Sequence, residues 1–128
     1  IYCNETGGDA PQRMWAVRAD GSGNRPLFPE EAADWVTHEL VADRDTVLFN
    51  LMGHTPELRR RPTGVMALNL RTGEVQPLGQ TPRGQGFWHC HGTADGRWAV
   101  TDNFDGEIHL INRRTGELTL VSTGHVMK

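Results

Sequence analysis

The feature that most constrains the fold is a short motif that occurs twice. Arg-Thr-Gly-Glu occupies residues 71–74 and again residues 114–117, 43 positions apart. Alternating apolar segments flank both copies, at 65–69 and 75–78 for the first and at 108–112 and 118–121 for the second. Each copy therefore predicts a strand, a tight turn and a second strand. Self-similarity at a fixed period indicates a repeat architecture.

The similarity extends upstream of the motif and back to the start of the chain. Ala-Asp-Arg-Asp at 42–45 leads into an apolar segment, as Ala-Asp-Gly-Arg at 94–97 does, and residues 14–28 form a partial third copy. A period of about 40 to 45 residues made of short strands is typical of a β-propeller blade. Helical repeats fit poorly, because the apolar positions alternate and Gly supplies 15 of the 128 residues.

We therefore predict an all-β fold, a β-propeller fragment of about three four-stranded antiparallel blades. Its parts are a partial blade over 1–33, a blade over 34–84, a blade over 85–124 and the start of a further blade over 125–128. A propeller needs about 4 to 8 blades, because each blade buries its faces against its neighbours. We expect the ring to be completed by the remaining blades of a longer polypeptide or by other copies of the chain.

Charge and hydropathy exclude two classes of partner. The 13 Lys and Arg against 16 Asp and Glu give a net charge of −3, so the basic excess that non-specific nucleic-acid binding requires is absent. The longest apolar segments are far shorter than the roughly 20 residues that cross a bilayer. No signal peptide is recognisable, and we expect a cytoplasmic protein that binds neither nucleic acid nor membrane. The two cysteines, Cys3 and Cys90, are expected to be reduced thiols.

Three of the six histidines fall at related positions of the repeat. His38 lies five residues before Asp43, whereas His89 and His91 lie six and four residues before Asp95. The first strand of each propeller blade lines the central channel, so we expect these imidazoles to converge there from adjacent blades. Because residues i and i+2 of a strand face the same side, the histidine pair should project together and the intervening cysteine should point away.

Three imidazoles together suit a borderline divalent cation such as Mn, Zn, Fe or Ni, with open positions left for substrate. Gln85, just upstream of the pair, adds a neutral amide oxygen. The alternative interpretation is a set of hydrogen-bonded or exposed histidines that bind no metal. His54 and His109 are expected on the surface or in loops, and Asp102 is a candidate acidic group near the channel.

Aromatic and arginine residues are candidates for substrate binding. Trp35 and Trp88 precede the histidine sites and either form walls for a sugar ring or pack in the core between blades. Arg59 and Arg83 belong to an arginine-rich set suited to bidentate recognition of carboxylates. The alternative for these arginines is a solvated surface charge.

Several segments in combination resemble a known family. They are the opening strand at 1–5, Arg-Met-Trp at 13–15, Thr-His-Glu at 37–39, and the His-x-His pair at 89–91 ahead of the Asp-Gly turn at 95–96. Together they resemble the later blades of oligogalacturonate lyases, and the likeness covers nearly the whole chain. Those enzymes are seven-bladed propellers that act on short pectin-derived uronides.

The resemblance implies a manganese ion, or another divalent transition metal, held by His38, His89 and His91. Gln85 would be the amide ligand, although it stands four residues before His89 and the family pattern has three. The implied reaction is β-elimination on an oligogalacturonide, in which a base removes the proton at C5 while the metal offsets the charge developing on the uronate carboxylate. The family's catalytic His and Arg fall upstream of Ile1, so no catalytic residue is assigned to this chain.

Two rival functions remain open. A non-catalytic TolB-like propeller would serve as an interaction scaffold and would need no metal. A metal-dependent lyase or hydrolase for another uronide would use the same ligands with a different substrate pocket. Fold alone does not separate these alternatives, because propellers host many functions.

Overall fold

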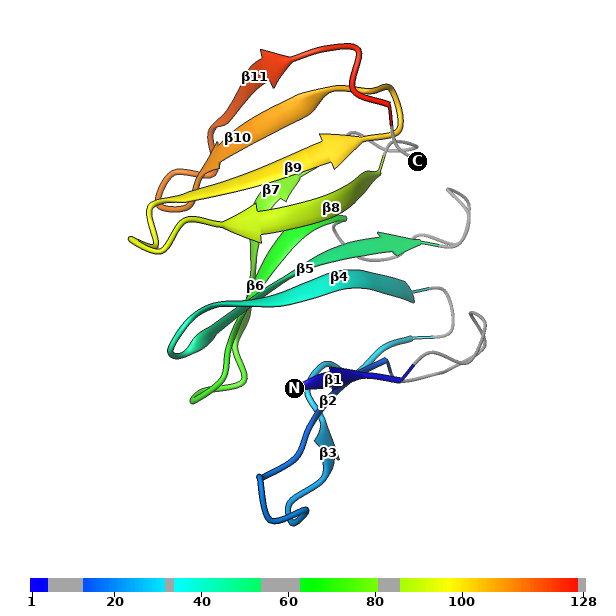
Figure 1. The fold of residues 1–128 in the computed structure, drawn as a ribbon, viewed down its shortest axis with the longest axis vertical. Helices are drawn as coiled ribbons and strands as arrows, with labels where there is room; N and C mark the ends of the chain where they lie inside the picture. The colour runs from blue at the N-terminus through cyan, green and yellow to red at the C-terminus, as the bar shows by residue number, and fades with distance from the viewer. Residues whose placement is uncertain (5–12, 32–33, 54–62, 81–85, 127–128) are drawn as a thin grey trace.

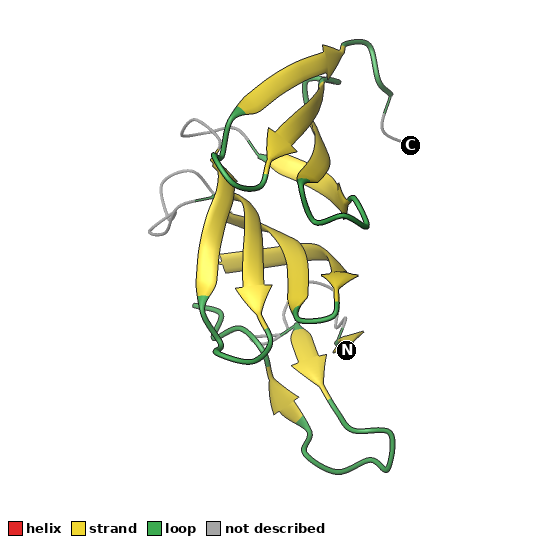
Figure 2. Cartoon of the chain, turned by 90° about the vertical axis from the view of Figure 1, so that its left-hand side faces the viewer, coloured by secondary structure: helices red, strands yellow, loops and turns green. Residues whose placement is uncertain are grey.

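The structure is a computed structural model that describes residues 1–4, 13–31, 34–53, 63–80 and 86–126. These ranges contain eleven strands and no helix (Figures 1 and 2). A helix long and apolar enough to cross a membrane is accordingly not found within them. The all-β class predicted from the repeat is confirmed.

The strands form three antiparallel sheets that follow one another along the chain. The first sheet has the order β1-β2-β3 and the bounds β1 (Tyr2–Cys3), β2 (Met14–Ala16) and β3 (Arg25–Pro26). The second has the order β4-β5-β6-β7, with β4 (Asp34–Asp43), β5 (Thr46–Gly53), β6 (Gly64–Asn69) and β7 (Val75–Gln80). The third has the order β8-β9-β10-β11, with β8 (Phe87–Gly92), β9 (Trp98–Asn103), β10 (Ile108–Asn112) and β11 (Leu118–Ser122). Sheets of consecutive strands stacked in this way are the blades of a β-propeller.

The two copies of the repeated motif form the same turn. The backbone N–H of Gly73 donates to Asn69 O at 2.8 Å, and that of Gly116 donates to Asn112 O at 2.8 Å. Both glycines have a left-handed φ, 75° and 74° respectively, which glycine adopts without the steric penalty of a Cβ. Each asparagine side chain also accepts a backbone N–H two residues further on, at 2.9 and 3.0 Å. The predicted strand–turn–strand units are confirmed in detail.

Strand β5 joins the three blades because both of its faces are buried. Phe49 packs in one apolar cluster with residues of the first blade, including Phe28 at a ring-centroid distance of 5.1 Å. Leu48 points the opposite way, into a second cluster that contains Phe87 and Ile111 of the third blade. A strand covered on both sides explains why its sequence is a nearly continuous apolar segment.

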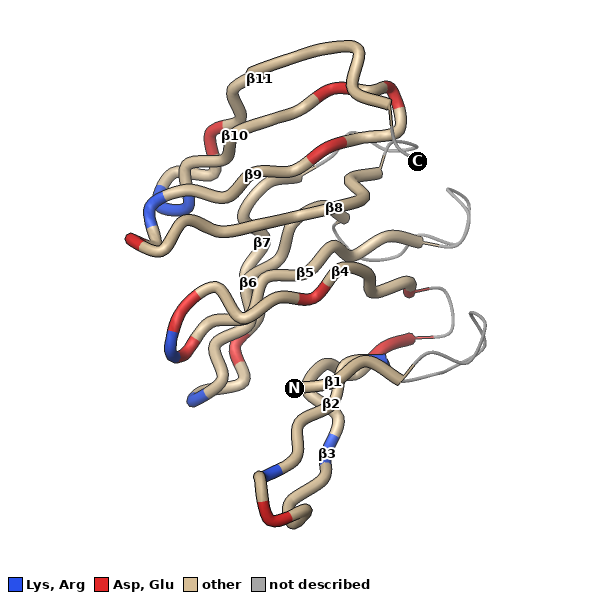
Figure 3. The backbone as a smooth tube through the Cα atoms, in the orientation of Figure 1, with Lys and Arg blue, Asp and Glu red and all other residues tan. Residues whose placement is uncertain are grey.

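The first strands of the second and third blades, β4 and β8, lie next to each other (Figure 1). They carry the predicted histidine sites, so the fold brings these two segments together as the sequence analysis expected. Charged residues gather at the turns that join β4 to β5, β8 to β9 and β10 to β11, and further acidic residues lie within β4 and β9 (Figure 3). The exact blade boundaries remain predictions.

Candidate metal and substrate site

Both neighbouring strands have a β-bulge at the histidine site. In β4, His38–Glu39 lie opposite a single residue of β5, and in β8, Trp88–His89 lie opposite a single residue of β9. Bulges bend the strand and re-aim its side chains. His38 adopts φ 52°, in the left-handed region that non-glycine residues rarely occupy. Such a conformation costs free energy and is held by the surrounding contacts.

The register of the two histidine sites differs from the one expected from the repeat. In the pairing of β4 with β5, His38 occupies the position that Trp88 occupies in the pairing of β8 with β9. The repeat alignment makes it equivalent to Cys90, between His89 and His91. The two differ because the connection from β8 to β9 is longer than the one from β4 to β5. The histidines of the two blades are therefore close in space without being equivalent in the repeat.

Hydrogen bonds between the blades hold the two bulges together. The amide of Asn50, which is fully buried, donates to Trp88 O at 2.6 Å. The Cys90 thiol donates to His38 O at 3.3 Å. Burial, with smaller contributions from the charges of nearby carboxylates, raises the pKa of the Cys90 thiol to about 12, so the sulfur keeps its proton and acts as a donor.

These bonds place His38 beside His89, with their ring centroids 4.4 Å apart. His38 also contacts the Trp88 ring at 5.0 Å in an edge-to-face arrangement. Burial and the neighbouring His89 lower the pKa of His38, which favours the neutral imidazole. Neutral imidazole is the form that coordinates metal ions.

His89 is held by a buried carboxylate from the next strand. Its ring Nδ1 lies 2.8 Å from Asp102 Oδ2, and its backbone N–H donates to Asp102 Oδ1 at 2.8 Å. The Nε2 atom of His125 lies 3.1 Å from the same Oδ2. Burial raises the pKa of Asp102, but the hydrogen bonds from His89 and the charges of both imidazoles outweigh it, so the pKa is lowered. Asp102 is a candidate acidic group from the sequence, but neither of its histidine partners is predicted by a sequence motif.

His91 lies on the same side of β8 as His89. Both are exposed while Cys90 between them is buried, which is the alternation expected of a strand. The two histidines line a pocket of about 310 Å³ together with Asp102 and His125. The Nδ1 atom of His91 lies 2.9 Å from Gly92 O. In both histidines the backbone or a carboxylate occupies Nδ1 and leaves Nε2 for another ligand.

A second pocket, of about 340 Å³, opens beside His38. Its lining includes Trp35 and Trp88, whose rings meet edge-to-face at 5.4 Å. Both tryptophans are half-buried, so each contacts its neighbours and presents part of its ring to the pocket. Arg13 also lines this pocket, although the sequence analysis did not select it. It is buried, and its side chain donates to the Cys3 sulfur at 3.5 Å.

Several predicted residues lie outside the part of the chain that the structure describes. These are Gln85, Arg59, Arg83 and His54. His109 was expected on the surface or in a loop, but it is half-buried in β10, where its Nε2 lies 3.0 Å from Glu107 Oε2. Its position in a strand that pairs on both edges explains the difference.

The donor chemistry of the histidine site fits a divalent transition metal, but a complete site is not assembled. His38 and His89 contact each other, and His89 and His91 both leave Nε2 available. Within the described ranges, however, no three His, Cys, Asp or Glu side chains are close enough to hold a metal ion. Metal binding at this site would require the imidazoles of His38, His89 and His91 to move closer together.

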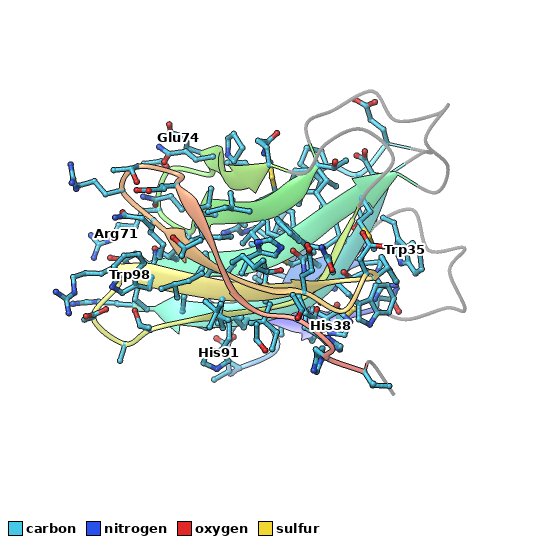
Figure 4. All side chains as sticks on the ribbon, turned by 90° about the horizontal axis from the view of Figure 1, so that it is seen from above. Trp35, His38, Arg71, Glu74, His91 and Trp98 are labelled. Atoms are coloured by element: carbon cyan, nitrogen blue, oxygen red, sulfur yellow. The ribbon has the colours of Figure 1, made fainter. Side chains whose placement is uncertain are left out.

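A larger pocket, of about 580 Å³, lies away from the histidines of the candidate site. It is formed between the second and third blades and includes Glu74 and Trp98 in its lining. Seen from above, Trp98, Glu74 and Arg71 lie at one end of the sheets, whereas His38 and Trp35 lie toward the other (Figure 4). This pocket contains none of the predicted ligands, so we place the candidate site at the two smaller pockets beside His38 and His89.

Taken together, three consecutive antiparallel blades with histidines on adjacent first strands define a segment of a β-propeller. Among solved structures, the chain is similar to an oligogalacturonate lyase in complex with manganese, with a TM-score of 0.77, 20% identity, and coverage of 94% of this chain and 32% of that chain. It is also similar to the oligogalacturonate lyase of Vibrio parahaemolyticus, with a TM-score of 0.74, 20% identity and the same coverage, 94% and 32%.

The chain thus spans about a third of the length of these two enzymes. At this identity the likeness shows a shared fold, and at that level it agrees with the resemblance drawn from the sequence. No protein-family model matches the chain, and no curated protein matches it.

Proposed function

We propose that this chain is part of an oligogalacturonate lyase and carries most of the ligands of its metal site. The observation that carries the proposal is the contact between His38 and His89 across adjacent blades, with ring centroids 4.4 Å apart. The contact occurs in a fold shared with an oligogalacturonate lyase that was solved with manganese. The proposed substrate is a short oligogalacturonide derived from pectin.

His38, His89 and His91 would hold Mn²⁺ or another divalent transition metal, with Gln85 as a fourth ligand. When bound, such an ion supplies positive charge that stabilises the developing negative charge on the uronate carboxylate. The protein residues contribute imidazoles whose Nδ1 atoms are already engaged at His89 and His91. Such outer hydrogen bonds orient metal-binding histidines and raise their basicity.

The pocket beside His38 is the proposed substrate-binding site. The exposed parts of Trp35 and Trp88 offer apolar surface to a sugar ring. Arg13 lines the same pocket and offers a guanidinium to a uronate carboxylate, and Arg59 and Arg83 are further candidates for that role. The base that removes the C5 proton would come from blades outside this chain. Those blades, or other copies of this chain, are the proposed structural partners, and a cytoplasmic location stays a prediction.

Metal titration of the chain tests the proposal directly. Mn²⁺ is added to the purified 128-residue chain, to His38→Ala and to His89→Ala, and free Mn²⁺ is followed by its EPR signal. We expect stoichiometric binding by the original chain and a loss of affinity of at least about tenfold in both variants, because each removes one ligand. His109→Gln is the matched control, since it changes a histidine bonded to Glu107 outside the site.

The same substitutions in a full-length protein containing this segment should lower the lyase rate, followed by the absorbance of the unsaturated product. Absence of Mn²⁺ binding by a chain shown to be folded, together with unchanged lyase activity in both variants, would contradict the proposal.

A second candidate is a non-catalytic TolB-like propeller that acts as an interaction scaffold. The observation in its favour is that the described residues contain no preassembled group of three metal-binding side chains. It predicts no Mn²⁺ binding by any variant. A lyase or hydrolase for another uronide would bind the metal equally well, and assays with different uronides separate it from the first proposal.

A further inference from the structure

We propose that Asp102 is a positioning residue that fixes the tautomer of His89, with the proton on Nδ1 and the lone pair on Nε2. His125, from the segment after β11, supports the same carboxylate. The link to metal binding rests on the proposed function, but the tautomer of His89 is a property of the metal-free chain.

Asp102 contacts His89 at two points. Oδ1 accepts the backbone N–H of His89 and Oδ2 lies against its ring Nδ1, both at 2.8 Å. The carboxylate is largely buried, with 8% of its side chain exposed. An ionised carboxylate only accepts hydrogen bonds, so Nδ1 must carry a proton, and Nε2 of the neutral ring is left as the free donor atom.

The bulge in β8 makes this two-point contact available. Trp88–His89 lie opposite Asp102 alone, so the N–H of His89 is directed to the Asp102 side chain. The bulge in β4 has Phe49 at the corresponding position, between the pairs formed by Thr37 and Leu40. A bulge can therefore form in this fold without an acidic residue opposite it. We infer that the role of the Asp102 carboxylate is to orient the imidazole of His89, because the bulged backbone does not require a carboxylate.

His125 also contacts the carboxylate of Asp102. Its Nε2 lies 3.1 Å from Asp102 Oδ2, and its backbone N–H donates to Gly106 O at 2.9 Å. The segment passes so close to the turn after β9 that a Cβ at Gly106 would lie 2.7 Å from His125 O. The outgoing segment of the third blade is thus held against the group that orients His89.

The tautomer can be read directly by two-bond ¹H–¹⁵N NMR spectra of the metal-free chain. In spectra recorded at about pH 8, we expect the Nδ1–H form at His89. In Asp102→Asn the side-chain oxygen keeps the backbone bond while its NH₂ group faces the ring. We expect the proton to move to Nε2 as a result.

Metal affinity tests the consequence of this change. We expect Asp102→Asn to weaken Mn²⁺ binding by about 10- to 100-fold, the usual effect of losing such a partner. Glu107→Gln is the matched control, because it changes a carboxylate bonded to a histidine outside the site, and it should leave the affinity unchanged. His125→Gln, which removes only the second partner, should retain the Nδ1–H form at His89 with a smaller loss of affinity.

The possible outcomes separate this inference from the proposed function. An Nε2–H form at His89 in the original chain would overturn the inference even if no variant folds. So would an Mn²⁺ affinity that is unchanged in a folded Asp102→Asn. If the tautomer changes as expected but no protein binds Mn²⁺, the proposed function fails and the role of Asp102 in setting the tautomer stands.

Discussion

At the scale of single residues, burial separates the two cysteines of the chain. Cys90 is 9% exposed and its thiol donates to His38 O, whereas Cys3 is exposed. Burial, followed by the charge of Glu39, raises the pKa of both thiols, and that of Cys90 reaches about 12. Both were expected as reduced thiols, and among the described residues both are free. The physical difference between them is access to solvent.

Alkaline pH should therefore destabilise the chain through Cys90. The folded pKa lies above the ordinary value of 9.0, so the stabilisation is complete below about pH 9 and is lost as the pH rises toward 12. We expect the unfolding free energy, measured by urea denaturation, to fall more steeply over this window in the original chain than in Cys90→Ala. Equal slopes would show that Cys90 does not titrate in this way.

Iodoacetamide at neutral pH should label only Cys3 until the chain unfolds.

At the scale of strands, the site depends on the contact between the bulges of β4 and β8. Asn50 is fully buried in β5 and donates to Trp88 O at 2.6 Å, 38 residues away in the sequence. The bond crosses from the second blade to the third and fixes the backbone beside His89. Together with the bond from the Cys90 thiol to His38 O, it supports the contact between the two histidines.

Asn50→Ala should cost about 1–3 kcal/mol of stability, because it removes a buried hydrogen bond and leaves the Trp88 carbonyl without this donor. The measurement is urea unfolding followed by tryptophan fluorescence. Asn24→Ala is the matched control, since the Asn24 side chain accepts a hydrogen bond from Tyr2 at an exposed site, and it should change stability by less than about 0.5 kcal/mol. If the two substitutions have equal effects, Asn50 does not hold the bulges together.

The sequence predicts the strands and turns but not the bulges. The turns at Asn69–Gly73 and Asn112–Gly116 follow from local chemistry, an asparagine that caps the turn and a glycine with left-handed φ. The bulges depend on pairing between strands and on packing between blades, which a repeat alignment does not contain. His38 lies beside His89, as the repeat predicts, but the register differs because the connection from β8 to β9 is longer than the one from β4 to β5. The separation of Asp102 and His125 in the sequence matches no motif, so the sequence does not predict the contact between them.

At the scale of the whole molecule, the blades at the two ends of the stack expose apolar side chains. On the third blade Leu120 and Val121 of the edge strand β11 are 51% and 61% exposed, and Phe104 and Val126 are 58% and 71% exposed. In a propeller each blade covers the face of the next. An unpaired edge strand with exposed apolar residues is also a template for association.

We therefore expect the isolated 128-residue chain to self-associate in a concentration-dependent way, measured by sedimentation velocity. Leu120→Lys combined with Val121→Lys places two charges on the exposed edge strand and should shift the chain toward the monomer. Both positions lie on β11, which β10 separates from β9, the strand of Asp102, so Mn²⁺ affinity should be retained in the double variant. Val17→Lys is the matched control, because Val17 is an exposed apolar residue, 41% exposed, that follows β2 in the first blade.

If the double variant associates as strongly as the original chain, the exposed edge of β11 is not the surface through which copies meet. Association would then be attributed to the first blade, where Val17→Lys should reduce it.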